Sequence, residues 1–198
     1  MLGGGPQSIL PRPVKNPHTT YPDYLEQERT SGIKHDYLRG DVWAMAGGTP
    51  EHGRLTMSIG ALIGNELKGK PCVVFSSDVR IRIEATDRST YPDVSVVCGP
   101  DARASDDPDA ITNPVVIVEV LSPTTERSDR GEKFSHYQRL ASVQEYVLVS
   151  HDAPRIEVFR RQGQDWLLSI YQAGATVALA SIGISFATND VYADPRAG

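Results

Sequence analysis

Residues 115–121, Val-Val-Ile-Val-Glu-Val-Leu, form the most apolar run in the chain, and Ser122-Pro123 ends it. Its β-branched residues predict a strand that is buried on both faces. Glu119 is the one acid inside this run. A buried carboxylate costs free energy unless a partner or a cation compensates its charge. From the residues alone, a structural ion pair and a metal site are equally good explanations of Glu119.

A second acid, Asp93, opens the valine-rich segment 91–98, which is predicted to be the preceding long strand. Neighbouring strands lie about 4.8 Å apart, so two carboxylates on one face can converge on a single hard cation. Mg²⁺ is typically bound by one or two carboxylates together with waters and substrate phosphates. The pair Asp93 and Glu119 is therefore a candidate Mg²⁺ site.

The segment after the apolar run 115–121 predicts a helix over residues 129–140, in which Asp129 and Glu132 have the spacing of a capping box. Lys133 follows, and from this helix its amine could reach back to the strand of Glu119. There it could orient a nucleophile or stabilise phosphate charge. The alternative is an ordinary solvated lysine on a helix surface.

The remaining pattern predicts an α/β fold with a central mixed sheet flanked by helices. Helices are expected over residues 21–29 and 51–68, and a hairpin over 35–45 with Gly40 in its turn. Further strands are expected over 72–76, 78–83, 145–150, 155–160 and 166–171. In residues 78–83 apolar and charged residues alternate, which indicates one wet face. The acidic residues 99–114 are expected to form a solvated loop without calcium-loop spacing.

Length and composition limit the class of protein. The chain has 198 residues, a net charge of −5 and ordinary globular composition. We expect a flexible leader over residues 1–16 and one domain over 17–198. No apolar run is long enough for a transmembrane helix, no secretory signal is evident, and Cys72 and Cys98 are expected to be buried, reduced thiols, so a cytoplasmic location is expected. Walker, Gly-x-Ser-x-Gly and zinc-site spacings are missing.

Several segments together resemble one family. They are Tyr91-Pro92-Asp93-Val94, then Val118-Glu119-Val120-Leu121-Ser122-Pro123, then Asp129, Lys133 and Tyr137, then Glu145-Tyr146-Val147-Leu148-Val149. This ordered set is similar to the Uma-two family of putative restriction endonucleases, in the PD-(D/E)XK nuclease superfamily, over about residues 21–192. The resemblance implies a restriction-endonuclease-like fold. It also implies that Asp93, Glu119 and the backbone carbonyl of Val120 bind Mg²⁺.

The chain departs from the superfamily pattern at one important place. The lysine expected two residues after the second acid is replaced by Leu121, which cannot orient water. The family is thought to compensate with a lysine on the next helix, and Lys133 matches that position.

The resemblance also suggests additional site residues, each with a plain structural alternative. Asp36 and Asp41 flank the hairpin turn, and either could contribute an acid or be an exposed turn residue. His52 opens the long helix, Asp78 opens the alternating strand, and Tyr137 lies one helical turn after Lys133. Each could face the site, or could be a surface, strand-capping or packing residue.

The resulting hypothesis is a Mg²⁺-dependent endonuclease, with Mn²⁺ as a substitute, that hydrolyses DNA phosphodiester bonds with a metal-activated water. A double-strand cut usually needs two active sites, so a homodimer is expected. The alternative is a catalytically degenerate module on the same fold that binds nucleic acid or protein. The acidic net charge and Leu121 favour that alternative.

Overall fold

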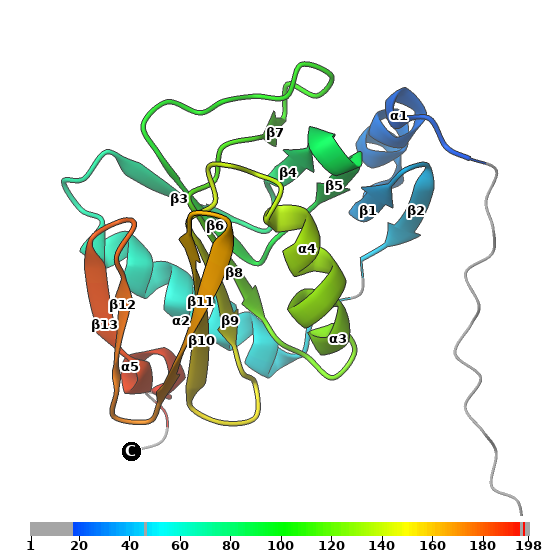
Figure 1. The fold of residues 1–198 in the computed structure, drawn as a ribbon. Helices are drawn as coiled ribbons and strands as arrows, with labels where there is room; N and C mark the ends of the chain where they lie inside the picture. The colour runs from blue at the N-terminus through cyan, green and yellow to red at the C-terminus, as the bar shows by residue number, and fades with distance from the viewer. Residues whose placement is uncertain (1–17, 46, 195, 197–198) are drawn as a thin grey trace, which may run out of the picture.

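The computed structural model describes residues 18–45, 47–194 and 196, so the leader predicted over residues 1–16 lies outside the described residues. A six-stranded sheet forms the centre, in the order β11-β10-β9-β8-β6-β3 (Figure 1). Its strands are β3 (Cys72–Ser76), β6 (Val94–Cys98), β8 (Val116–Val120), β9 (Glu145–Val149), β10 (Arg155–Gln162) and β11 (Asp165–Gln172). β8 and β9 are parallel and the other pairs are antiparallel, which confirms the predicted mixed sheet.

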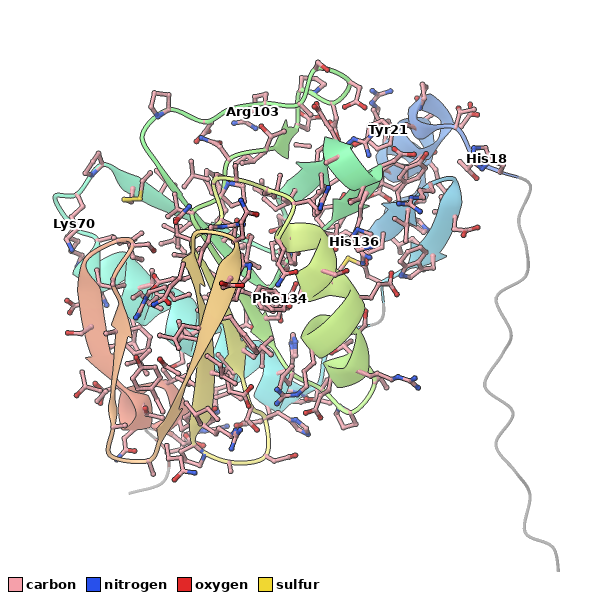
Figure 2. All side chains as sticks on the ribbon, viewed as in Figure 1. His18, Tyr21, Lys70, Arg103, Phe134 and His136 are labelled. Atoms are coloured by element: carbon pink, nitrogen blue, oxygen red, sulfur yellow. A yellow bond between two sulfur atoms is a disulfide. The ribbon has the colours of Figure 1, made fainter. Side chains whose placement is uncertain are left out.

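Helices cover both faces of this sheet, as predicted (Figure 1). On one face lie α2 (Pro50–Glu66), α5 (Thr188–Tyr192) and the hairpin of β12 (Thr176–Leu179) and β13 (Ile184–Ala187). The apolar stripe Leu55, Ile59 and Ile63 of α2 is fully buried against β6 and β8. On the other face lies a helical segment made of α3 (Glu126–Ser128), a π-helical turn (Asp129–Lys133) and α4 (Phe134–Tyr137). Figure 2 shows Phe134 between this segment and the sheet, where its ring stacks on Tyr146 at 4.8 Å.

A second sheet has five strands in the order β2-β1-β5-β4-β7, and it packs beside the helical segment of α3 and α4. Its strands are β1 (His35–Leu38), β2 (Asp41–Ala44), β4 (Arg80–Ile83), β5 (Arg88–Thr90) and β7 (Ala110–Ile111), with α1 (Tyr21–Ser31) against β1 and a 3₁₀ turn (Glu84–Thr86) between β4 and β5. β1 and β2 form the predicted hairpin, and Arg39 and Gly40 in its turn both have positive φ. Among the described residues, no helix is both long and apolar enough to cross a membrane.

The prediction of a wet face on residues 78–83 is wrong. Arg82 is only 5% exposed, because Asp87 and Asp106 neutralise its guanidinium and Tyr21 stacks on it. Asp107 is buried and pairs with Arg80 at 2.9 Å. The acidic loop is therefore not simply solvated, since it supplies the partners of the β4 arginines.

The prediction of reduced thiols is also wrong, because Cys72 and Cys98 form a disulfide. They stand directly opposite each other on the antiparallel strands β3 and β6, with their Cα atoms 4.0 Å apart. Directly opposed residues on antiparallel strands have adjacent Cβ atoms, so this register lets the two sulfurs meet. The bond ties the edge strand β3 to the strand that Asp93 precedes.

Candidate active site

The two predicted acids meet at the end of β8. Val94 of β6 is paired with Val118 of β8, and the antiparallel register places Asp93, one residue before β6, across from Glu119. The Val120 backbone N–H donates to Asp93 Oδ2 at 2.7 Å. This hydrogen bond fixes the Asp93 carboxylate over the end of the neighbouring strand.

Glu119 is 3% exposed, and its partners come from the helical segment that follows β8. Lys133 Nζ donates to Glu119 Oε1 at 2.8 Å, and the Tyr137 hydroxyl donates to the same oxygen at 3.1 Å. Lys133 and Tyr137 are four residues apart, so both point from one face of the helix toward the sheet. Glu119 is thus held by an ion pair with Lys133 and by a hydrogen bond from Tyr137.

Asp129 is a member of the site that the sequence analysis missed. The predicted capping box at Asp129 is wrong, because the chain is already helical from Glu126 and the Asp129 N–H donates to the Thr125 carbonyl at 2.9 Å. Its carboxylate is buried, and its Oδ1 lies 3.5 Å from Lys133 Nζ. The four-residue spacing to Lys133 was the available signal for this pairing.

His52 enters the site from α2. Thr49 caps the helix by accepting from the His52 N–H, which places His52 in the first turn of the helix. His52 Nε2 lies 3.2 Å from Asp93 Oδ2. The hydrogen bond to Asp93 raises the pKa of His52, and a hydrogen bond to the Val120 backbone raises it further, against the opposing effect of burial.

The electrostatics of the site are dominated by buried negative charge. Burial raises the pKa of Glu119 to about 8; Lys133 opposes this shift, and nearby Asp129 and Asp93 add to it. Burial also raises the pKa of Asp129 against the effect of Lys133. Burial alone would lower the pKa of Lys133, but Glu119 and Asp129 reverse that effect and hold it above its usual value. Three carboxylates thus share one ammonium group and one imidazole.

The structure does not bring all the suggested acids together. Asp36 is buried, with Arg88 as its ion-pair partner at 3.5 Å, and its charge helps to raise the pKa of Lys133. Asp41 is exposed at the hairpin turn, and Asp78 is exposed and paired with Lys34. Within the described part of the chain, no contact joins Asp41 or Asp78 to Asp93 or Glu119.

Asp93 and Glu119 have the donor chemistry that a hard divalent cation needs. No cluster of three or more His, Cys, Asp or Glu side chains arranged for a metal occurs among the described residues. Mg²⁺ does not require such a cage, since one or two carboxylates with waters suffice. Burial and the nearby acids raise the pKa of Glu119 even beside Lys133, so a bound cation would stabilise the ionised form of this carboxyl group. The residues present therefore fit a Mg²⁺ ion held by Asp93 and Glu119.

The site opens toward a groove between α2 and strands β3 and β6. One hollow of about 300 Å³ is lined by Thr56, Met57, Gly60, Val74 and Asp93, among others. An adjoining hollow of about 320 Å³ includes His52 and again reaches Asp93. A substrate could thus approach the Asp93 side of the acid cluster.

Comparisons with known proteins agree with this architecture. Residues 21–189 match the model of the Uma2 (Uma-two) family, described as "Putative restriction endonuclease". Two uncharacterized proteins of Synechocystis sp. (strain ATCC 27184 / PCC 6803 / Kazusa) are similar. One is 40% identical over 86% of this chain and 89% of its own length, and the other is 31% identical over 76% and 85%.

A solved structure shares the fold. It is the crystal structure of "a putative nuclease belonging to DUF820" from Anabaena variabilis ATCC 29413. It matches with a TM-score of 0.67 and 18% identity, over 81% of this chain and 90% of that one. The family match spans most of the chain and both sides of the acid cluster, so this protein belongs to the Uma2 family.

Proposed function

We propose that this protein is a Mg²⁺-dependent endonuclease that hydrolyses phosphodiester bonds of DNA. The observation that carries the proposal is the register that places Asp93 across from Glu119, together with the buried amine of Lys133 at 2.8 Å from Glu119. Its membership of a family described as "Putative restriction endonuclease" supports this activity, as does the fold that it shares with a protein described as "a putative nuclease". A homodimer and a cytoplasmic location belong to the same proposal, although the Cys72–Cys98 disulfide removes reduced thiols as an argument for that location.

In this proposal Asp93 and Glu119 hold the cation, and Mn²⁺ can replace Mg²⁺. When bound, such an ion stabilises negative charge on a phosphate oxygen and lowers the pKa of water. Lys133 keeps its proton beside Glu119 and offers positive charge to a phosphate. His52 orients Asp93, and Tyr137 orients Glu119.

The replacement of the usual lysine by Leu121 does not remove the amine from the site. Leu121 is buried in the core beneath the helical segment, together with Tyr137 and Tyr146. Lys133 reaches Glu119 from that segment instead. This contact favours an active enzyme over the catalytically degenerate module.

Cleavage of supercoiled plasmid and linear duplex DNA with Mg²⁺ or Mn²⁺ tests the proposal. We expect Asp93→Asn, Glu119→Gln and Lys133→Ala to lose cleavage while their circular dichroism spectra stay native. Asp78→Asn is the matched control, because it neutralises an exposed acid outside the cluster, and it should cleave normally. Full activity of Glu119→Gln refutes the mechanism. Intact DNA with every preparation, together with DNA retention, favours the binding module.

A further inference from the structure

The edge strand β11 is unusual for an exposed sheet edge. It pairs with β10 over eight consecutive residues without a bulge, and in the described part of the chain it has no strand on its other side. Leu167, Leu168 and Ile170 are 46%, 42% and 47% exposed. Residues 166–172, Trp-Leu-Leu-Ser-Ile-Tyr-Gln, contain no Asp, Glu, Lys or Arg. Native proteins usually protect such edges with charges, prolines, bulges or short strands.

The backbone of β11 presents free hydrogen-bonding groups in a regular order. The Arg155 carbonyl accepts from Ser150 at 3.0 Å, so Arg155 directs its backbone toward the β9 side. In an antiparallel ladder this direction alternates, so Ile156 and Val158 turn toward β11, where they face Tyr171 and Ser169. The even-numbered residues of β11, Leu168 and Ile170 among them, therefore direct their N–H and C=O groups to the open edge.

The exposed side chains point to both faces of the sheet. Ile170 stands opposite Glu157, Glu157 opposite Leu148, and Leu148 opposite Glu119, so Ile170 shares a face with Glu119. Leu167, of opposite parity, lies on the other face. A helix or loop laid on one face would cover only one of these groups. A strand added at the edge covers both and satisfies the free backbone groups.

We propose that β11 pairs antiparallel with β11 of a second copy of this chain, around a two-fold axis at Ser169. This register sets Leu168 opposite Ile170 of the other copy on one face, and Leu167 opposite Tyr171 on the other. Apolar side chains then meet apolar side chains, and no like charges face each other, because the segment is uncharged. The same patch serves both partners, as a two-fold interface requires.

The interface leaves the acid clusters free. β8 lies three strands from β11, or about 14 Å at the usual strand spacing. The inference does not depend on nuclease activity, and an interface variant should retain Asp93, Glu119 and Lys133 in place.

Sedimentation equilibrium of the full chain tests this assembly. We expect a mass twice the 21.6 kDa of one chain, and a single-chain mass for Leu168→Lys/Ile170→Lys. Val73→Lys is the matched control, since Val73 is an exposed apolar residue on the opposite edge strand β3, and it should remain a dimer. A monomeric parent protein, a lysine variant that stays dimeric, or a monomeric Val73→Lys each overturns the proposal.

A second measurement does not rely on disruptive charges. Cys72 and Cys98 are bonded to each other, so Ser169→Cys adds the one reactive thiol in a chain with two cysteines. At the two-fold axis it faces its own copy across a non-hydrogen-bonded pair, where Cα atoms lie about 4.5 Å apart. Oxidised glutathione should then give a covalent dimer on a non-reducing gel, and Leu167→Cys, which faces Tyr171, should not. No cross-link for Ser169→Cys, or equal cross-linking of both, overturns this register.

Discussion

Cation affinity at the candidate site should depend steeply on pH, because Glu119 must give up a proton to bind a metal. Burial raises the pKa of Glu119 to about 8 in the cation-free protein, with Asp129 and Asp93 adding to the effect and Lys133 opposing it. Below that pH the carboxyl group is mostly protonated. A divalent ion must therefore compete with a proton for Glu119.

The expected size of this effect follows from the pKa. Each pH unit below the pKa costs about 1.4 kcal/mol, which is a factor of about 10 in affinity. Since Glu119 is about half ionised at pH 8 and about 1% ionised at pH 6, we expect the dissociation constant for Mn²⁺ to be roughly fiftyfold larger at pH 6. Well above pH 8 the affinity should level off.

Isothermal titration calorimetry with Mn²⁺ between pH 6 and 9 measures this dependence. Repeating the titration at pH 7 in buffers of different ionisation enthalpy counts the protons released, and we expect about one per ion. His52→Asn controls for the histidine beside Asp93 and should retain most of the slope. Glu119→Gln should lose the slope together with tight binding. Equal dissociation constants at pH 6 and pH 8, with no proton released, would refute the reasoning.

Three further perturbations test other contacts. Folding raises the pKa of Glu119, so the folded protein keeps a proton that the unfolded chain loses. In urea titrations without added metal, the unfolding free energy should therefore fall as pH rises from about 5 to 8. Glu119→Gln should flatten this dependence. Arg88→Met removes a guanidinium that is 1% exposed and pairs with Asp36 and Glu132, so it should lower that free energy by about 3–5 kcal/mol. Arg103→Met is the matched control, because it removes the exposed ion pair with Asp101, and it should lower the unfolding free energy by at most about 1 kcal/mol. Cys72→Ser opens a loop closed by a disulfide with a sequence separation of 26 and should cost about 3 kcal/mol in the same assay.

Apolar periodicity was sufficient to predict most of the main sheet and its long helix. Residues 72–76 were predicted as a strand and form β3, and the predicted strand over 115–121 contains β8. The stripe of Leu55, Ile59 and Ile63 predicted α2 to within two residues at each end. The short elements β5, β7, β12, β13 and α5 were missed, because two to five residues are too few to show a period.

Charge alternation misled the prediction for β4, since the partners of its arginines are distant in sequence. Arg80 and Arg82 alternate with apolar residues, as on a strand with one solvated face. Asp107 and Asp106, on the acidic loop, form ion pairs with Arg80 and Arg82 and so allow these arginines to be buried. Sequence spacing predicts contacts between close neighbours, but it gives no signal for an ion pair that tertiary folding forms. The Cys72–Cys98 disulfide was missed for the same reason.

The position of Lys133 shows how the site tolerates Leu121 where a lysine was expected. Glu119 and Leu121 are two residues apart in an extended segment, so their side chains share the face that the helical segment covers. A lysine at position 121 would leave a charge in the buried cluster that also holds Tyr146 and Tyr137. Leucine packs there, and the amine comes from the covering helix, where Asp129 and Glu119 both compensate its burial. Asp129 and Lys133 are the first and last residues of a π-helical turn, and such turns frequently occur at functional sites. Leu121 and Lys133 therefore act together: Leu121 keeps the core apolar, and Lys133 brings a positive charge to Glu119 from the helical segment that covers this face of the sheet.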